Sequence, residues 1–228
     1  MGTDLHAHGN HNIVFQNREY HEIAEEIRLK LEALDLNNSP FLKHYQLWQA
    51  HVYDWNETQE KILKKFDWSY AEEYDLPKFD KEKTIEFHGP LGISIDFKEH
   101  SIMFFEPSYR YWTWFEPQFE KIRNEWRKFI YTVISHFGGN KVVYLPNNGH
   151  NLFEFNYFEG TFEEMEKALE EKFGKPQKTF SGVMADFDNA YLIDYFDDLN
   201  FNEVIDFNEL LPLDSPKYKP RPTPKFFI

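Results

Sequence analysis

The chain has 228 residues, with 39 Asp and Glu against 25 Lys and Arg, which gives a formal net charge of −14. It contains no Cys, so a disulfide scaffold, a Cys-ligated zinc site and a thiol catalyst are all excluded. The acid excess argues against nucleic acid as a partner, because phosphate binding needs a basic face. Aromatic residues make up 19% of the chain, and disordered acidic chains hold few aromatics, so we expect a folded globular protein.

The sequence shows no sign of membrane insertion or export. No run of 18 apolar residues occurs, so we expect neither a membrane span nor a membrane partner. The first twelve residues lack the basic and apolar regions of a secretory signal. We therefore expect a cytoplasmic protein, and the sequence does not define its oligomeric state.

The first part of the chain predicts mainly helices. A polar arm is expected over residues 1–11, followed by a short strand at 12–15. Apolar residues at helical spacing then predict three helices, at 19–35, 40–54 and 57–66.

The middle of the chain changes to short β-rich segments. Turn residues separate three of them, which predicts a meander of strands at 84–88, 92–97 and 101–106. A helix is then expected from 117 to 137, with apolar residues every three or four positions. Two consecutive glycines, Gly138 and Gly139, are expected to end this helix.

The following part of the chain combines strands with one helix. Thr161 and Glu164 have the spacing of a capping box, which predicts a helix that begins at Thr161 and ends at Gly174. Further strands are expected at 141–145, 152–158, 183–187 and 191–196.

The order of these elements predicts the fold class. Because strict alternation of strands and helices is absent, we expect an α+β fold, in which a mainly antiparallel sheet packs against several amphipathic helices. No long linker divides residues 1–211, so they are expected to form a single domain. Residues 212–228 hold five Pro and four basic residues, which predicts a Pro-rich basic tail of extended chain.

Part of the acid excess is concentrated in one stretch. Residues 179–216 hold nine acids, seven aromatics and no Lys or Arg. This composition fits a solvated acidic face whose aromatics fill the core. It also fits a surface for a basic partner, where acids speed the encounter and aromatics anchor the complex. The residues expected to bind such a partner are Asp186, Asp188, Tyr191, Asp194, Tyr195, Asp197, Asp198, Glu203 and Asp206.

Two other kinds of site remain as alternatives. The segment Asp4-Leu5-His6-Ala7-His8 resembles the D-L-H-x-H opening of amidohydrolase and polymerase-and-histidinol-phosphatase type metal hydrolases. In those families two His face one metal from a strand end, so the resemblance implies a metal-dependent hydrolase that uses His6, His8 and His11. The aromatic stretch Tyr109–Trp114 suggests a small-ligand groove instead. No catalytic motif or cofactor site is otherwise predicted.

The central part of the chain has a weak family resemblance. The helix that ends in Gly138 and Gly139, the segment 141–149 (KVVYLPNNG) and the acidic helix at 160–177 form a familiar order. Over about residues 117–177, this order is similar to a pattern in small acidic bacterial proteins, some of which look like immunity proteins encoded beside polymorphic toxins. The resemblance implies a cytosolic binding role without catalytic residues. We therefore expect a non-enzymatic interaction protein that neutralises a basic toxin or effector domain by occlusion.

Overall fold

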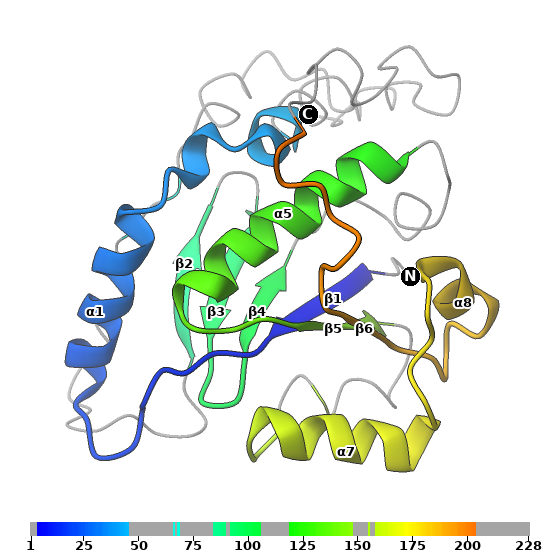
Figure 1. Cartoon of the computed structure of the whole chain (residues 1–228). Helices are drawn as coiled ribbons and strands as arrows, with labels where there is room; N and C mark the ends of the chain where they lie inside the picture. Colours follow the sequence, from blue (N-terminus) through cyan, green and yellow to red (C-terminus); the bar gives the residue numbers. More distant parts are fainter. Residues whose placement is uncertain are drawn as a thin grey trace, which may run out of the picture.

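The protein has an α+β fold in which helices cover both faces of one antiparallel sheet (Figure 1). A computed structural model describes residues 4–45, 66, 68, 84–89, 92–105, 119–147, 155 and 158–203. The described elements are β1 (Asp4–Gly9), α1 (Tyr20–Glu32), η1 (Leu36–Asn38), β2 (Ile85–His88), β3 (Ser94–Phe97), β4 (Ile102–Phe105), α5 (Glu120–His136), β5 (Val142–Asn147), α7 (Phe162–Phe173), α8 (Phe180–Ala185) and β6 (Leu192–Asp194).

The sheet has six strands in the order β2-β3-β4-β1-β5-β6, and each neighbouring pair is antiparallel. The expected α+β class is therefore confirmed, and so is the meander of β2, β3 and β4. Within the meander, Ile95 lies opposite Phe87 on one side and Phe104 on the other. These apolar residues face the larger part of the core, as the alternation of strand side chains requires.

Helix α5 packs across this face of the sheet. Trp126 of α5 lies edge-on to Phe104 of β4, with 6.1 Å between the ring centroids. Ile134 lies against Gly9 of β1, where an added Cβ would come within 2.4 Å of its Cγ2 atom. The small residue at position 9 thus lets α5 approach the centre of the sheet closely. The expected helix at 117–137 is confirmed within the described residues.

Helix α7 covers part of the opposite face. Phe162, Met165 and Leu169 form a second apolar cluster with Val143 and Leu145 of β5. The predicted capping box is present at the start of this helix. The Thr161 hydroxyl accepts from the Glu164 backbone N–H at 3.2 Å, and the Glu164 carboxylate accepts from the Thr161 backbone N–H at 2.8 Å.

Three expectations about the chain were wrong. The polar arm expected over 1–11 contains β1, which pairs with both β4 and β5 and so lies inside the sheet. The strand expected at 12–15 is irregular chain. The strand expected at 183–187 belongs entirely to α8 and the turn after it, because Thr179 caps that helix by accepting from the Gly182 backbone N–H.

Several expected elements fall outside the described residues. These are the second half of the helix at 40–54, the helix at 57–66 apart from Phe66, the strand at 152–158 apart from Phe155 and Phe158, and the tail at 212–228.

Candidate partner-binding surface

A tight turn after β6 directs consecutive side chains to opposite sides. Phe196 has a φ of 62°, in the left-handed region that costs a non-glycine residue about 1–2 kcal/mol. Its backbone N–H donates to the Asp194 carboxylate at 2.8 Å, and its ring packs on Tyr131 with 5.1 Å between the centroids. Phe196 is consequently buried, whereas Tyr195 is 54% exposed.

A buried ion pair holds this turn against helix α5. The Arg127 guanidinium donates to both oxygens of Asp194, from Nε at 2.6 Å and from Nη2 at 2.8 Å. It also donates to both oxygens of Asp198, at 3.2 and 2.5 Å. Although burial disfavours the charged form, the hydrogen bonds to the two carboxylates raise the pKa of Arg127 above its ordinary value. The same contact with Arg127 lowers the pKa of Asp198.

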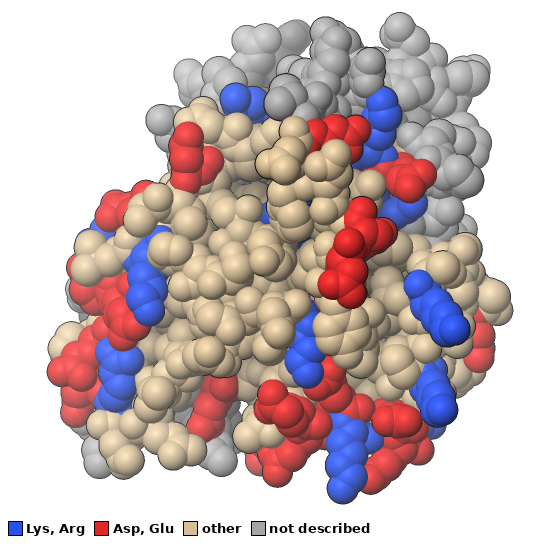
Figure 2. Space-filling model, viewed as in Figure 1, with Lys and Arg blue, Asp and Glu red and all other residues tan. Residues whose placement is uncertain are grey.

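Two aromatic residues and three acids of this segment are exposed to solvent. Phe201 is 47% exposed and contacts Tyr131, with 4.7 Å between the ring centroids. The acidic residues Asp197, Asp198 and Glu203 are exposed as well. Figure 2 shows acidic side chains over the segment that Figure 1 draws in orange, while the middle of this face carries little charge. We call this group the acidic–aromatic surface, and it consists of Tyr195, Asp197, Asp198, Phe201 and Glu203.

Few large hydrophobic side chains are exposed in the described part of the chain, and two of them belong to this segment. These large exposed hydrophobic residues are Val14, Leu29, Tyr195 and Phe201. Two of these, Tyr195 and Phe201, lie six positions apart in the sequence and flank the exposed acids Asp197 and Asp198. Exposed apolar groups that cluster in this way are typical of interaction sites, whereas isolated ones are ordinary.

The remaining predicted partner-binding residues have different positions. Asp186 and Asp188 are exposed in the turn after α8, where Asp186 accepts from the Asn189 side chain at 3.0 Å. Tyr191 is 1% exposed and donates to the Gly174 carbonyl at 3.1 Å. Tyr191 and Asp194 therefore support the fold beneath the surface and have little area to offer a partner. Asp206 lies outside the described residues.

A pocket of about 470 Å³ adjoins the acidic–aromatic surface. Tyr195, Asp198, Arg123 and Lys178 are among the residues that line it. The Arg123 guanidinium lies over the Phe180 ring, 5.3 Å from its centroid. The pocket thus gives the surface a concave margin with charges of both signs, which suits a protein side chain better than a small ion.

The three histidines of the N-terminal motif do not converge. His6 and His8 lie on the same face of β1 with 6.5 Å between their ring centroids, and both are buried. The His11 Nδ1 atom accepts from the Ile13 backbone N–H at 3.1 Å, so its Nε2 atom carries the proton and donates to the Lys98 carbonyl at 2.9 Å. Both ring nitrogens of His11 are therefore engaged away from the pair.

Burial also determines the protonation of the motif. Burial, with the nearby charge of Lys98, lowers the pKa of His6 to about 4. Within the described residues, no group of three or more His, Asp or Glu side chains is arranged to hold a metal ion. Sequence reasoning missed this buried position, although the alternation of polar and small residues in β1 carried a signal for a strand.

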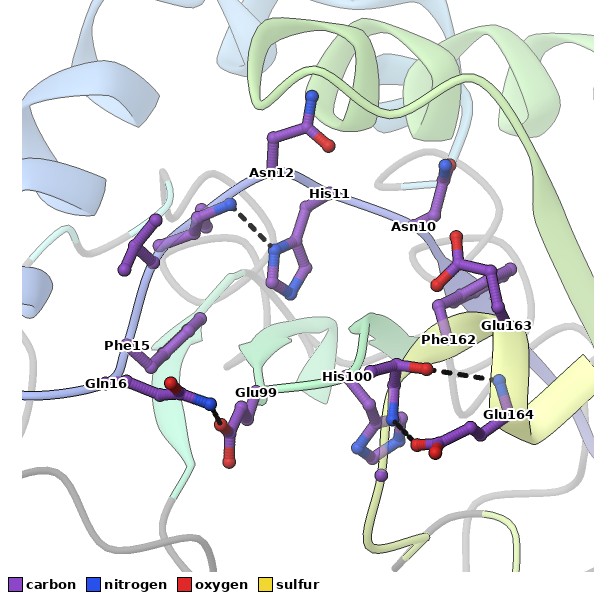
Figure 3. A pocket seen from close by; sticks show the side chains of 14 residues that line it. Asn10, His11, Asn12, Phe15, Gln16, Glu99, His100, Phe162, Glu163 and Glu164 are labelled. Atoms are coloured by element: carbon purple, nitrogen blue, oxygen red, sulfur yellow. Dashed lines mark hydrogen bonds between the residues drawn. The ribbon is translucent and has the colours of Figure 1, made fainter.

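A second pocket, of about 440 Å³, lies beside His11 (Figure 3). Residues 10–16, the turn at Glu99 and His100, and the start of α7 enclose it. Its polar groups are largely engaged with one another, since Gln16 donates to Glu99 at 3.5 Å and Glu164 completes the capping box. This pocket therefore offers few free groups for recognition. The aromatic stretch Tyr109–Trp114 lies outside the described residues.

Comparison with known protein families, with curated proteins and with solved structures finds no match to this chain. In the part of the chain that the structure describes, no helix combines the length and the apolar character needed to cross a membrane.

Proposed function

We propose that this protein is a cytoplasmic interaction module that binds a basic protein partner through the acidic–aromatic surface. The observation that carries the proposal is the placement of Tyr195 and Phe201, two exposed aromatic side chains with acids between them. The segment that presents them is anchored by the buried contact of Arg127 with Asp194. A preorganised surface loses little conformational entropy when it binds, so more of the contact energy becomes affinity.

The chemistry of the surface favours a basic partner. Residues 179–203 hold no Lys or Arg, and the whole chain has a net charge of −14. A field of this sign speeds the encounter with a positive surface and makes the association rate depend on salt. Tyr195 and Phe201 would supply the desolvated anchors that dominate interface energies.

The partner class that we propose is a toxin or effector domain, which the protein would neutralise by occluding its basic active face. The resemblance of residues 117–177 to immunity-like proteins supports this choice, together with the acidic character of the chain. A binding role of this kind requires no catalytic residue or cofactor.

The test is capture of the partner from a lysate of the native host, followed by binding measurements with the purified pair. The variants Tyr195→Ala with Phe201→Ala and Asp197→Lys with Glu203→Lys each change two exposed residues. Asp198 is left unchanged because it also contacts Arg127. We expect Tyr195→Ala with Phe201→Ala to weaken binding at least about 10-fold, since anchor residues contribute about 2 kcal/mol or more. The two charge reversals should weaken binding by lowering the association rate and its dependence on salt.

Matched controls separate a local effect from a general one. Leu29→Ala removes an equally exposed apolar side chain on α1, where the exposed fraction is 54%. Glu159→Lys with Glu163→Lys reverses two exposed charges near the start of α7. If these controls weakened the complex as much as the variants at 195–203, the acidic–aromatic surface would not be the binding site.

A further inference from the structure

The basic Pro-rich segment, residues 212–228, has the chemistry of a ligand. It contains Pro212, Pro216, Pro220, Pro222 and Pro224, spaced two or four positions apart. Chains of this composition favour the extended polyproline II helix, in which little further entropy is lost on binding. The same segment carries Lys217, Lys219, Arg221 and Lys225, with no acid after Asp214.

The acidic–aromatic surface has the complementary chemistry. Polyproline helices dock on exposed aromatic rings, and Tyr195 and Phe201 present such rings at 54% and 47% exposure. Asp197, Asp198 and Glu203 are exposed in the same segment and are opposite in charge to the basic residues of 212–228. The aromatic rings of the surface would bind the extended Pro-rich chain, and its acids would bind the basic residues of that chain.

The position of the segment in the chain brings the two together. Pro212 follows Glu203 by nine residues, and nine residues of extended chain span about 30 Å at most. A short connection of this kind gives an effective concentration in the millimolar range. Docking within the chain therefore needs an intrinsic dissociation constant of only about 1 mM to be substantially populated.

We propose that residues 212–228 dock on the acidic–aromatic surface of the same chain and compete there with the basic partner. The competition rests on the proposed function, whereas the docking itself does not. A partner must then displace the segment, so a strongly basic protein can bind the surface, whereas a weakly basic one cannot compete with the segment. Free protein is also protected from non-specific association through its exposed aromatic side chains.

The docking can be measured on the full chain by paramagnetic relaxation. The chain has no Cys, so the variant Thr223→Cys accepts a single nitroxide label within the segment. We expect the label to broaden the amide signals of residues 195–203 at least about twofold more than those around Leu29 on α1. The difference should disappear in about 1 M NaCl, where the Debye length falls to about 3 Å.

Two further variants test the chemistry of the contact. Replacing Lys217, Lys219, Arg221 and Lys225 by Glu, in the labelled chain, should abolish the selective broadening, and so should Tyr195→Ala with Phe201→Ala. Leu29→Ala should leave it unchanged. Broadening at 195–203 no greater than that around Leu29, or broadening that survives the four charge reversals, would overturn the proposal.

The competition has its own readout. The four charge reversals should raise the affinity for the captured partner about two- to tenfold, because a larger fraction of the surface is then free. If the label broadens residues 195–203 selectively, but Tyr195→Ala with Phe201→Ala leaves the affinity for the partner unchanged, the proposed function is refuted and the docking is not. Partner binding through this surface without selective broadening would refute the docking alone.

Discussion

Arg127 of helix α5 and Asp194 at the end of β6 form a bidentate ion pair, although 67 positions separate them in the sequence. Both are almost fully buried, with exposed fractions of 6% and 7%. The pair joins the edge strand of the sheet to the central helix. Because the turn at Phe196 also depends on Asp194, this contact determines how residues 195–203 are presented.

The first prediction concerns the loss of the cation from this pair. In Arg127→Met the Asp194 carboxylate stays buried without its partner, which costs about 3–5 kcal/mol for a buried pair. We expect the free energy of unfolding, measured by urea denaturation, to fall by this amount. Replacing both residues, as Arg127→Met with Asp194→Asn, should recover part of the loss, because neither member of the pair is then charged and the Asn side-chain oxygen can still accept from the Phe196 backbone N–H.

The outer carboxylate of the same cluster provides the control. The side chain of Asp198 is 75% exposed, and exposed ion pairs contribute about 0–1 kcal/mol. Asp198→Asn should therefore change the free energy of unfolding by at most about 1 kcal/mol. Equal losses for Arg127→Met and Asp198→Asn would contradict the assignment of Asp194 as the principal partner.

The second prediction concerns acid stability. Burial lowers the pKa of His6, His44 and His100 to about 4, with the charge of Lys98 adding to the effect at His6 and His100. The unfolded chain has His pKa values of about 6.5, so it binds more protons than the folded state between pH 6.5 and 4. Stability should consequently fall as the pH decreases through this window.

One buried acid acts in the opposite direction. Burial raises the pKa of Asp96 to about 6, so the folded state binds its proton more tightly than the unfolded chain does. This group therefore favours the folded state as the pH falls from about 6 to about 4. Because three histidines oppose one carboxyl group, we still expect a net loss of stability.

The measurement is the urea midpoint at several values of pH between 7 and 4. In His6→Leu the urea midpoint should fall less as the pH decreases, and in Asp96→Asn it should fall more. A midpoint that stays constant over this range in the wild-type protein would show that the buried histidines are not held neutral by the fold.

The sequence predicted the elements whose apolar residues repeat regularly. The meander of β2–β4 and helix α5 have such patterns, because each buries one continuous apolar face. Strand β1 was missed because its residues in the main core are small, Ala7 and Gly9, and His6 and His8 lie on the other face. Leu5 is the one large apolar residue in the sequence of β1, so this inner strand gives little hydrophobic signal, although its alternation was visible.

The candidate site was predicted as a stretch but not residue by residue. Charge composition could identify residues 179–216 as acidic. It could not separate Asp194 from Asp197, since burial of the former depends on Arg127, which is remote in the sequence. Likewise, Tyr191 and Tyr195 are equivalent in composition, but only Tyr195 follows the turn that directs it to the solvent.

The third prediction tests the capping box of α7. Thr161→Ala removes the acceptor for the Glu164 backbone N–H, and loss of such a cap costs about 1 kcal/mol. Thr132→Ala on α5 is the matched control, because the Thr132 hydroxyl is exposed and donates within its own helix at 2.8 Å. Urea denaturation should show a loss for Thr161→Ala and almost none for Thr132→Ala. The reverse order would be inconsistent with a functional cap.

The fourth prediction concerns the close contact between the ends of α5 and β1. A Cβ added at Gly139 would lie 1.9 Å from the Asn10 backbone oxygen, and the Asn10 side chain accepts from the Asn140 and Lys141 backbone N–H groups at 2.8 and 3.0 Å. Overpacking usually costs about 1–3 kcal/mol, and here the obstructing atom belongs to the backbone and cannot rotate away. We therefore expect Gly139→Ala to destabilise the protein by about 3 kcal/mol or more.

A second glycine separates this clash from ordinary backbone strain. Gly174 has a φ of 77°, yet nothing lies within 4 Å of an added Cβ. With a ψ of −161°, Gly174 lies in a region that almost only glycine adopts, so Gly174→Ala should cost the backbone strain alone, about 1–3 kcal/mol. The urea midpoint should fall further for Gly139→Ala than for Gly174→Ala. If both fell equally, backbone conformation and not the contact with Asn10 would explain the glycine at position 139, and the close approach of β1 to the end of α5 would lose its support.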